Sequence, residues 1–194
     1  MTLLNAYRDN AFLQEDQVQP LVAEIRRRYK DDAQIPYHNY KHALDVAQMT
    51  HFLIRGIDDE QLPRRTKFFM IFAALCHDMQ HFGYGSTDIE THETGSPFKA
   101  ARATLKTGLD PLLQRSHMEF FHIHHAFTVM DNNFRLKREA MDTAKDIVKH
   151  VILATDHQNR DPYKNIIRAT NDDSVPTDNL PRQALLFIKV TTCL

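Results

Sequence analysis

Two short segments of this 194-residue chain carry side chains suited to binding a metal ion. In the first, His38 and His42 are four residues apart, so a helix would place both imidazoles on one face, which Asp45 continues. In the second, His77 and Asp78 follow an apolar run and offer an imidazole beside a carboxylate. This donor pair suits both borderline and hard divalent ions.

Either segment alone has an ordinary structural explanation. A histidine pair at helical spacing is most often a solvated or hydrogen-bonded surface pair, and a single His-Asp dipeptide is a weaker signal still. The combination is more specific, because each segment adjoins an apolar helix that could bury it and the chain contains 12 histidines. A metal-dependent hydrolase of the His-Asp type is therefore the leading hypothesis.

The two segments resemble motifs of the class I 3′,5′-cyclic nucleotide phosphodiesterases. Residues 38–46 read HNYKHALDV and residues 77–83 read HDMQHFG, similar to the two histidine motifs of that family. Residues 118–122, MEFFH, resemble its Leu-Glu-x-His-His helix, and residues 151–156, VILATD, resemble its Val-Leu-Ala-Thr-Asp segment. The resemblance runs from about Ile35 to the C-terminus, and four motifs in the family's order form a much stronger signal than one.

The resemblance implies a role for each matched residue. His42, His77 and Asp78 would be metal ligands. His38 would be the general acid that protonates the leaving 3′ oxygen, which suits an imidazole because its unperturbed pKa is near neutral pH. The cofactors implied are two divalent ions, Zn and Mg or Mn, which activate water for attack on phosphorus. The residues expected to surround the ligands are His81, Glu119, His122, Thr155 and Asp156.

The activity that the resemblance implies is hydrolysis of cAMP, cGMP or both to nucleoside 5′-monophosphates in signal transduction. Two alternatives remain open. Another metallophosphohydrolase of the His-Asp (HD) type would share His42, His77 and Asp78 but need not keep His38 and Asn39. A catalytically silent fragment would bind a metal or a partner helix without turnover.

The same resemblance predicts a catalytic domain that is incomplete at its C-terminus. The family's last ligand Asp follows a Lys-Val-Ala pattern, whereas residues 189–192 read KVTT and place Thr192 at the ligand position. The family's purine-binding Gln and aromatic clamp do not follow. We therefore expect impaired turnover by this chain, and self-association through uncovered apolar surface on helices 64–77 and 142–155.

Composition favours a single all-α domain, of the multi-helix HD phosphodiesterase type if the resemblance holds. Glycine is scarce, at 5 residues, and apolar residues recur at helical spacing. The length suits one domain with a sizeable core. We expect residues 1–34 to form an N-terminal helical segment and residues 35–194 to form the partial catalytic domain.

Periodicity and end signals predict the individual helices. We expect Gly56 to end the second helix in the left-handed conformation, Met49 and Phe52 to share the inward face of that helix with His42, and His51 to be exposed. Ser116 and Glu119 form a capping-box pattern that competes with a functional role for Glu119. Arg26 to Arg28 should be a solvated helix end. The expected helices span residues 16–29, 39–55, 64–77, 97–108, 117–130, 142–155 and 180–190.

Charge and targeting signals exclude several classes of partner. A net charge of −1 gives no broad basic surface for nucleic acid. The N-terminus lacks the pattern of a signal peptide, and the longest apolar run, Phe68 to Cys76, is far shorter than the roughly 20 residues that span a bilayer. Two cysteines are not a disulfide framework. We expect an intracellular, cytoplasmic protein that binds a cyclic nucleotide, but neither nucleic acid nor membrane.

Overall fold

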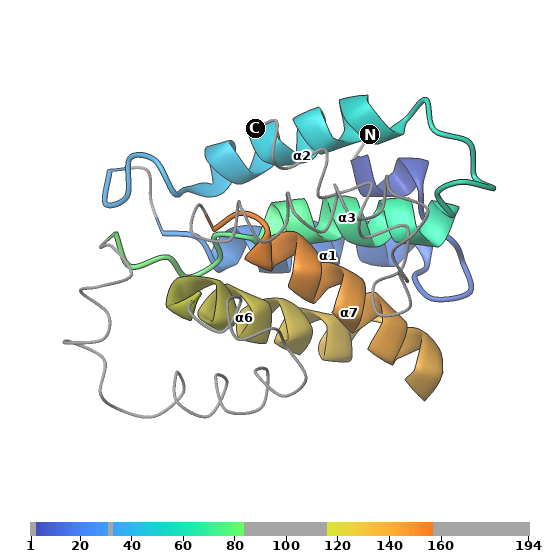
Figure 1. The fold of residues 1–194 in the computed structure, drawn as a ribbon. Coiled ribbons are helices and arrows are strands. Elements are labelled where there is room, and N and C mark those ends of the chain that lie inside the picture. The colour runs from blue at the N-terminus through green and yellow to red at the C-terminus, as the bar shows by residue number, and fades with distance from the viewer. Residues whose placement is uncertain (1–2, 31–32, 84–115, 157–194) are drawn as a thin grey trace, which may run out of the picture.

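The computed structural model describes residues 3–30, 33–83 and 116–156. Within these ranges every regular element is a helix, which confirms the expected all-α class. Thr192, the helices expected over residues 97–108 and 180–190, and Cys193 lie outside the described residues. The elements are a short 3-10 helix, η1 (Leu3–Ala6), and the α-helices α1 (Glu15–Arg27), α2 (Tyr40–Ile54), α3 (Arg64–Cys76), α6 (His117–Asn133) and α7 (Arg138–Leu153), shown in Figure 1.

Helix α3 is the centre of the fold. It lies between α2 on one side and α6 and α7 on the other (Figure 1). Eleven of its 13 residues are buried, as the almost uninterrupted apolar sequence after Lys67 predicts. Helix 64–77 therefore offers little of the uncovered apolar surface expected from the sequence, and self-association stays a prediction.

The N-terminal segment contributes directly to the core around α3. Phe12 packs edge-on against Phe68, with ring centroids 4.9 Å apart, and Phe134 stacks edge-on against the same ring at 5.7 Å. Leu4, at the start of the chain, and Leu153, at the end of α7, are fully buried in the same hydrophobic cluster. Residues before Tyr37 thus share one continuous core with the helices that follow.

Helix α2 begins at Asn39, whose side-chain oxygen accepts hydrogen bonds from the backbone N–H groups of Lys41 and His42. The amide of Asn39 donates to the carbonyls of Ile35 and Pro36, so the residue also fastens the preceding loop. This cap fixes where the helix starts and hence which way His42 faces.

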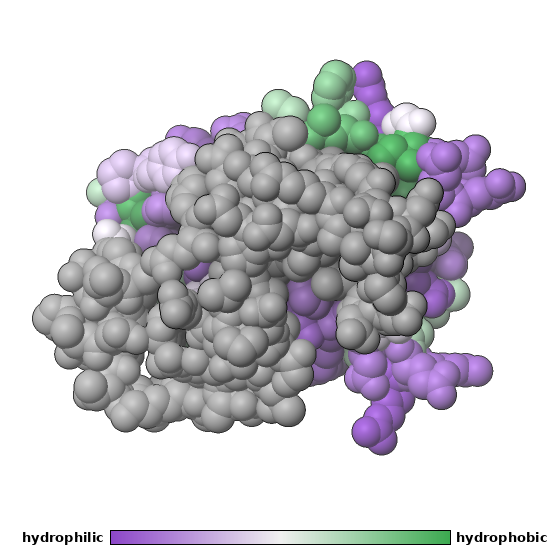
Figure 2. All heavy atoms as spheres, in the orientation of Figure 1, coloured by the Kyte–Doolittle hydropathy of each residue, from purple (hydrophilic) through white to green (hydrophobic). Residues whose placement is uncertain are grey.

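The buried face of α2 differs from the predicted one. Ala43 and Ala47 face the core, whereas Met49 and Phe52 are 43% and 59% exposed. Small residues let α2 approach α3 closely, and this close approach sets the rotation of the helix. His51 was predicted to be exposed, but it accepts a 2.9 Å hydrogen bond from the hydroxyl of Tyr7 if its Nδ1 is unprotonated. Figure 2 shows hydrophobic atoms at the surface along the upper edge, where Figure 1 places α2.

Two predicted helix ends are also wrong. Gly56 does not adopt a positive φ; α2 ends at Ile54, and the N–H of its C-cap residue, Arg55, donates to the carbonyl of His51. The capping box at α6 is not formed, because the hydroxyl of Ser116 donates to Asp156 at 2.7 Å instead. At the end of α2 the helical hydrogen-bond pattern simply continues to the C-cap residue. At the start of α6 a contact with another part of the chain replaces the local motif.

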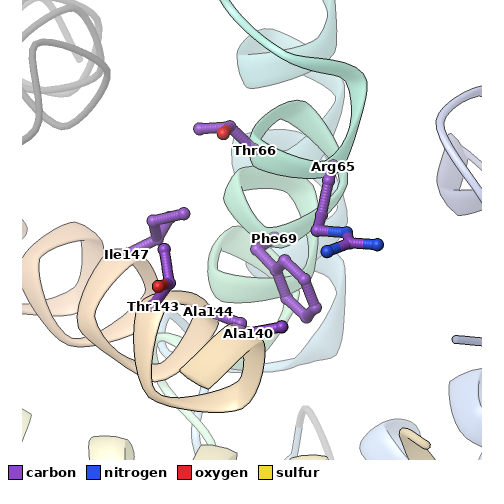
Figure 3. A pocket seen from close by; sticks show the side chains of 7 residues that line it. All are labelled: Arg65, Thr66, Phe69, Ala140, Thr143, Ala144 and Ile147. Carbon is purple, nitrogen blue, oxygen red and sulfur yellow. The ribbon is translucent and has the colours of Figure 1, made fainter. Parts of the chain in front are cut away.

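A small cavity of about 120 Å³ lies between α3 and α7. Figure 3 shows Phe69 from α3 and Ile147 from α7 on its walls, with Arg65 at the side. Because Arg65 and Thr66 belong to the first turn of α3, the cavity lies away from the histidines at the other end of that helix. It is therefore not part of the candidate site.

Candidate metal centre

Asp78 is the centre of the candidate site. It directly follows His77, the C-cap residue of α3, and is only 6% exposed. Imidazoles from α2, α3, α6 and the loop before α2 surround its carboxylate. The nitrogen-to-oxygen distances are 2.9 Å from His38 Nδ1, 3.2 Å from His77 Nε2, 3.7 Å from His42 Nε2 and 3.9 Å from His122 Nε2.

Backbone carbonyls set the tautomers of the two most buried imidazoles. His77 Nδ1 donates to the carbonyl of Ala74 at 2.8 Å, and His122 Nδ1 donates to the carbonyl of Met79 at 2.7 Å. A neutral ring with its proton on Nδ1 keeps its lone pair on Nε2, the arrangement found in metal-binding histidines. His122 Nε2 is buried without a hydrogen-bond partner, so its lone pair is available for a cation.

The residues form two overlapping groups that could hold a metal ion. His42, His77 and Asp78 make one group, and His38, Asp78 and His81 make the other; in each, the ligand atoms lie within 4.8 Å of one another. The first group is the ligand set expected from the sequence. Asp45, although it continues the helical spacing, is exposed and belongs to neither group.

His81 supports His38 through ring stacking. The two ring centroids are 4.0 Å apart and the planes are within 12° of parallel. The backbone N–H of Gly83 donates to His81 Nδ1 at 3.0 Å, which places the proton of the neutral ring on Nε2. Burial, followed by repulsion from His38, lowers the pKa of His81 to about 4, so the ring is neutral at pH 7.

Charge around Asp78 is balanced by protons on the imidazoles. Burial alone would raise the pKa of Asp78, but attraction to His77 and hydrogen bonds from His38 and His77 hold it well below its usual value. Burial would lower the pKa of His77, yet attraction to Asp78 raises it. Burial lowers the pKa of His122 to about 3, so His122 stays neutral. The carboxylate of Asp78 is thus ionised. The imidazoles around it are either neutral or carry a proton that a metal ion could replace.

The remaining predicted residues lie where α6 and α7 meet. Glu119 is partly buried, with one carboxylate oxygen buried without a hydrogen-bond partner. Desolvation together with repulsion from Asp156 raises the pKa of Glu119 to about 8. Asp156 accepts the hydroxyl of Ser116. Thr155 donates to the carbonyl of Ile152 at 2.7 Å, a local bond at the end of α7. The hydroxyl proton of Thr155 is therefore engaged in a hydrogen bond at the end of α7.

One residue beside the site was missed in the sequence. The hydroxyl of Tyr29 accepts a hydrogen bond from the backbone N–H of Asp78 at 3.4 Å. Nothing in the local sequence marks this contact, since the two residues are 49 positions apart and follow the ends of different helices. Only the position of the residues after α1 against the end of α3 reveals it.

An ionised, buried carboxylate ringed by imidazoles in a helical domain is an arrangement that could hold a divalent metal ion. The chain belongs to the 3′,5′-cyclic nucleotide phosphodiesterase family, whose family model matches residues 37–193. It is 23% identical over 185 residues to the cone cGMP-specific 3′,5′-cyclic phosphodiesterase subunit alpha′ of Gallus gallus, covering 87% of this chain and 20% of that protein. It is 29% identical over 132 residues to the probable 3′,5′-cyclic phosphodiesterase pde-1 of Caenorhabditis elegans, covering 62% and 17%.

Solved structures show the same fold. The phosphodiesterase domain of the RhoPDE fusion protein from Salpingoeca rosetta superposes with a TM-score of 0.69 at 18% identity, covering 98% of this chain and 56% of that domain. The chain therefore spans about half of this solved domain and a fifth or less of the curated relatives. Among the described helices, none has the length and apolar character needed to cross a membrane.

Proposed function

We propose that the protein hydrolyses 3′,5′-cyclic nucleotides, cAMP, cGMP or both, to nucleoside 5′-monophosphates with divalent metal ions held at Asp78. The observation that carries the proposal is the buried carboxylate surrounded by four imidazoles, two of which have Nδ1 bound to a backbone carbonyl. Family membership supplies the reaction class. Relatives named for cGMP and for cAMP both match, so both nucleotides are candidate substrates.

The donor atoms fit the metals of the proposal. His42, His77 and Asp78 supply two nitrogens and a carboxylate oxygen, a set that suits Zn²⁺ and leaves a position open. We propose a second ion, Mg²⁺ or Mn²⁺, that shares the carboxylate of Asp78, because these ions prefer oxygen ligands. When bound, the ions would supply an activated water and neutralise the phosphate oxygens.

His38 is proposed to hold the proton that goes to the leaving 3′ oxygen. Its side chain is 40% exposed, the most open of the imidazoles around Asp78. When its Nδ1 donates to Asp78, its other nitrogen, Nε2, is available for a proton that can be given to a substrate. The contact with Asp78 orients the ring of His38, and the stacked ring of His81 limits its rotation.

Glu119, His122, Thr155 and Asp156 are proposed to surround the metal site and orient what binds there. With a pKa of about 8, Glu119 carries a proton at pH 7 and can donate a hydrogen bond. His122 offers its unpartnered Nε2 towards Asp78. Glu119, His122 and Thr155 would fix the orientation of ligands and water without adding further negative charge.

Metal content and nucleotide turnover test the proposal together. The chain is stripped with a chelator, loaded with Zn²⁺ and Mg²⁺ or Mn²⁺, and passed through gel filtration before metal analysis; release of 5′-AMP and 5′-GMP is then followed by chromatography. We expect bound metal and slow hydrolysis in the wild type, both lost in His77→Ala and kept in His124→Ala. His124 belongs to neither metal group and is the matched control.

Two results would overturn the proposal at different levels. Equal, near-zero metal in the wild type and in His77→Ala would remove the metal site. Bound metal with no release of either monophosphate would favour the alternative of a metal-binding, catalytically silent chain.

A further inference from the structure

We infer that the end of α1 positions the metal-binding turn, with Tyr29 and Arg28 acting as a clamp on the backbone of residues 75–80. The inference rests on the proposed metal centre at Asp78. Both clamp residues precede residues 37–193, the region that the family model matches. The N-terminal segment would therefore be a working part of the site.

The hydroxyl of Tyr29 joins two points of the turn. It donates to the carbonyl of Leu75 at 2.9 Å and accepts from the N–H of Asp78 at 3.4 Å. Leu75 lies in the last turn of α3, where carbonyl groups lack partners within the helix. A tyrosine hydroxyl carries its proton at neutral pH, so it can act as a donor here. One side chain thus links the end of α3 to the backbone of Asp78.

The carbonyl of Arg28 holds the next part of the turn. It accepts a hydrogen bond of 2.9 Å from the N–H of Gln80. Gln80 has a φ of 61°, a left-handed conformation that is unfavourable for a residue other than glycine. Such a conformation persists only when its surroundings hold it. The bond from α1 is one of the contacts that do so.

Arg28 is itself fixed in place. Its guanidinium forms a 2.8 Å ion pair with Glu24, and Glu24 also accepts from the amide of Asn133 on α6 at 2.9 Å. The interpretation of Arg26 to Arg28 as a wholly solvated helix end is therefore wrong for Arg28. The clamp is tied to α6 as well as to α3.

The turn between the two anchor points carries several functional groups. Asp78 supplies the central carboxylate, and the carbonyl of Met79 accepts the proton of His122 Nδ1. His77 and His81 lie on either side. A shift of the turn would therefore move the carboxylate and change the orientation of His122 at the same time. Ligand geometry must be held to about 0.5 Å for a site to function well.

Tyr29→Phe removes the hydroxyl and keeps the ring. We expect about tenfold weaker binding of Zn²⁺, the lower end of the effect of removing a partner that orients a ligand. We also expect an altered visible absorption spectrum when Co²⁺ replaces Zn²⁺, because this spectrum reports ligand geometry. Affinity is measured by competition with a chromogenic chelator, at a temperature where thermal melts show both proteins folded.

Tyr40→Phe is the matched control. The Tyr40 ring packs beside Tyr29, with centroids 5.7 Å apart, but within the described residues its hydroxyl makes no hydrogen bond to the turn. We expect wild-type affinity and a wild-type Co²⁺ spectrum. This control separates loss of the Tyr29 hydrogen bonds from a general effect of losing a hydroxyl near the site.

The outcomes distinguish the inference from the proposed function. A wild-type chain that binds no metal would overturn both. A wild-type chain that binds metal, with Tyr29→Phe unchanged in affinity and spectrum, would overturn the clamp alone. If Tyr29→Phe does not fold, amide hydrogen exchange of the wild type decides: we expect slow exchange at Asp78 and Gln80, and exchange as fast as at exposed amides would overturn the clamp.

Discussion

An ionisable side chain is buried at each end of α3, but the charges of the two side chains are balanced by different kinds of partner. At the N-terminal end, Lys67 is 3% exposed, and its ammonium bonds the carboxylate of Asp59 at 2.6 Å and the carbonyl of Ile57. At the C-terminal end, Asp78 is 6% exposed, and every ion-pair partner of its carboxylate among the described residues is an imidazole. Lys67 is paired with a carboxylate, whereas Asp78 is paired with imidazoles, which are positively charged only when they hold a second proton.

This difference explains why one end is structural and the other suits a metal. Asp59 remains 60% exposed, so the pair with Lys67 is complete and keeps its anion in contact with water. Around Asp78, attraction raises the pKa of His77 while burial lowers that of His42. Protons on such rings can be exchanged for a cation, and metal binding then releases them. A buried charge does not by itself indicate a metal site. A buried carboxylate whose charge is balanced by imidazole protons, which a metal ion can replace, is a better indication.

Asp78→Asn should give the largest effect, because it removes the negative charge and keeps the size of the side chain. Losing a direct ligand should cost more than losing an outer partner, so we expect metal affinity to fall by more than about a hundredfold. Chelator competition measures it. Asp45→Asn, an exposed position on α2, is the control and should bind as the wild type does. Unchanged metal affinity in Asp78→Asn would mean that the imidazoles around Asp78 only stabilise the fold and do not form a metal site with it.

Substitutions of Asp59 and Lys67, the pair at the other end of α3, should change the free energy of unfolding by different amounts. Asp59→Ala leaves Lys67 buried without its counter-charge, and we expect a loss of about 2 to 4 kcal/mol in the free energy of unfolding. Lys67→Met removes the buried charge and leaves Asp59 in water, so we expect a change within about 1 kcal/mol. Urea denaturation measures both. Metal affinity should stay at the wild-type value in each.

The double variant sharpens this test. Lys67→Met with Asp59→Ala should resemble Lys67→Met alone, because no buried cation remains to be compensated. Equal losses in the two single variants, or a double variant equal to their sum, would contradict the assignment of a completed structural pair.

Sequence patterns predicted the fold where local composition decides the outcome. The apolar run of α3 and Pro63 before it define a buried helix within a residue of its observed bounds. The rotation of α2 could not be predicted in this way, because Met49 and Ala47 are both apolar and only the space beside α3 selects between them. Propensity and periodicity say that a helix forms, and packing decides which face is buried.

The site was predictable to the extent that its residues share a short spacing. His38 and His42 are four residues apart, and His77 and Asp78 are adjacent, so each pair could be recognised in the sequence as a candidate for metal binding. The partners that fix them come from far along the chain. Ser116 bonds Asp156 across 40 residues, in preference to the local capping box, and the contacts of Tyr29 are equally remote. Contacts of this kind follow from tertiary packing.

Gly83→Ala should give the smallest effect and tests the loop that follows the turn at Asp78. Gly83 has a φ of 90°, and an added Cβ would meet Ile35 at 3.7 Å, an ordinary contact. The cost is therefore backbone strain, about 1 to 2 kcal/mol in unfolding free energy. Because the N–H of Gly83 holds His81, which stacks on His38, we also expect a small fall in turnover with little change in metal affinity.

Gly56→Ala is the control for this last substitution. Gly56 does not have a positive φ, and an added Cβ would meet nothing within 4 Å. Alanine should be neutral there or stabilise the fold by up to about 1 kcal/mol, since it restricts the unfolded chain. Thermal and urea denaturation of the two variants measure the difference. If Gly56→Ala proved the more destabilising, the left-handed conformation would belong to the end of α2, as the sequence pattern suggested, and the support of His81 by the loop at Gly83 would have to be abandoned.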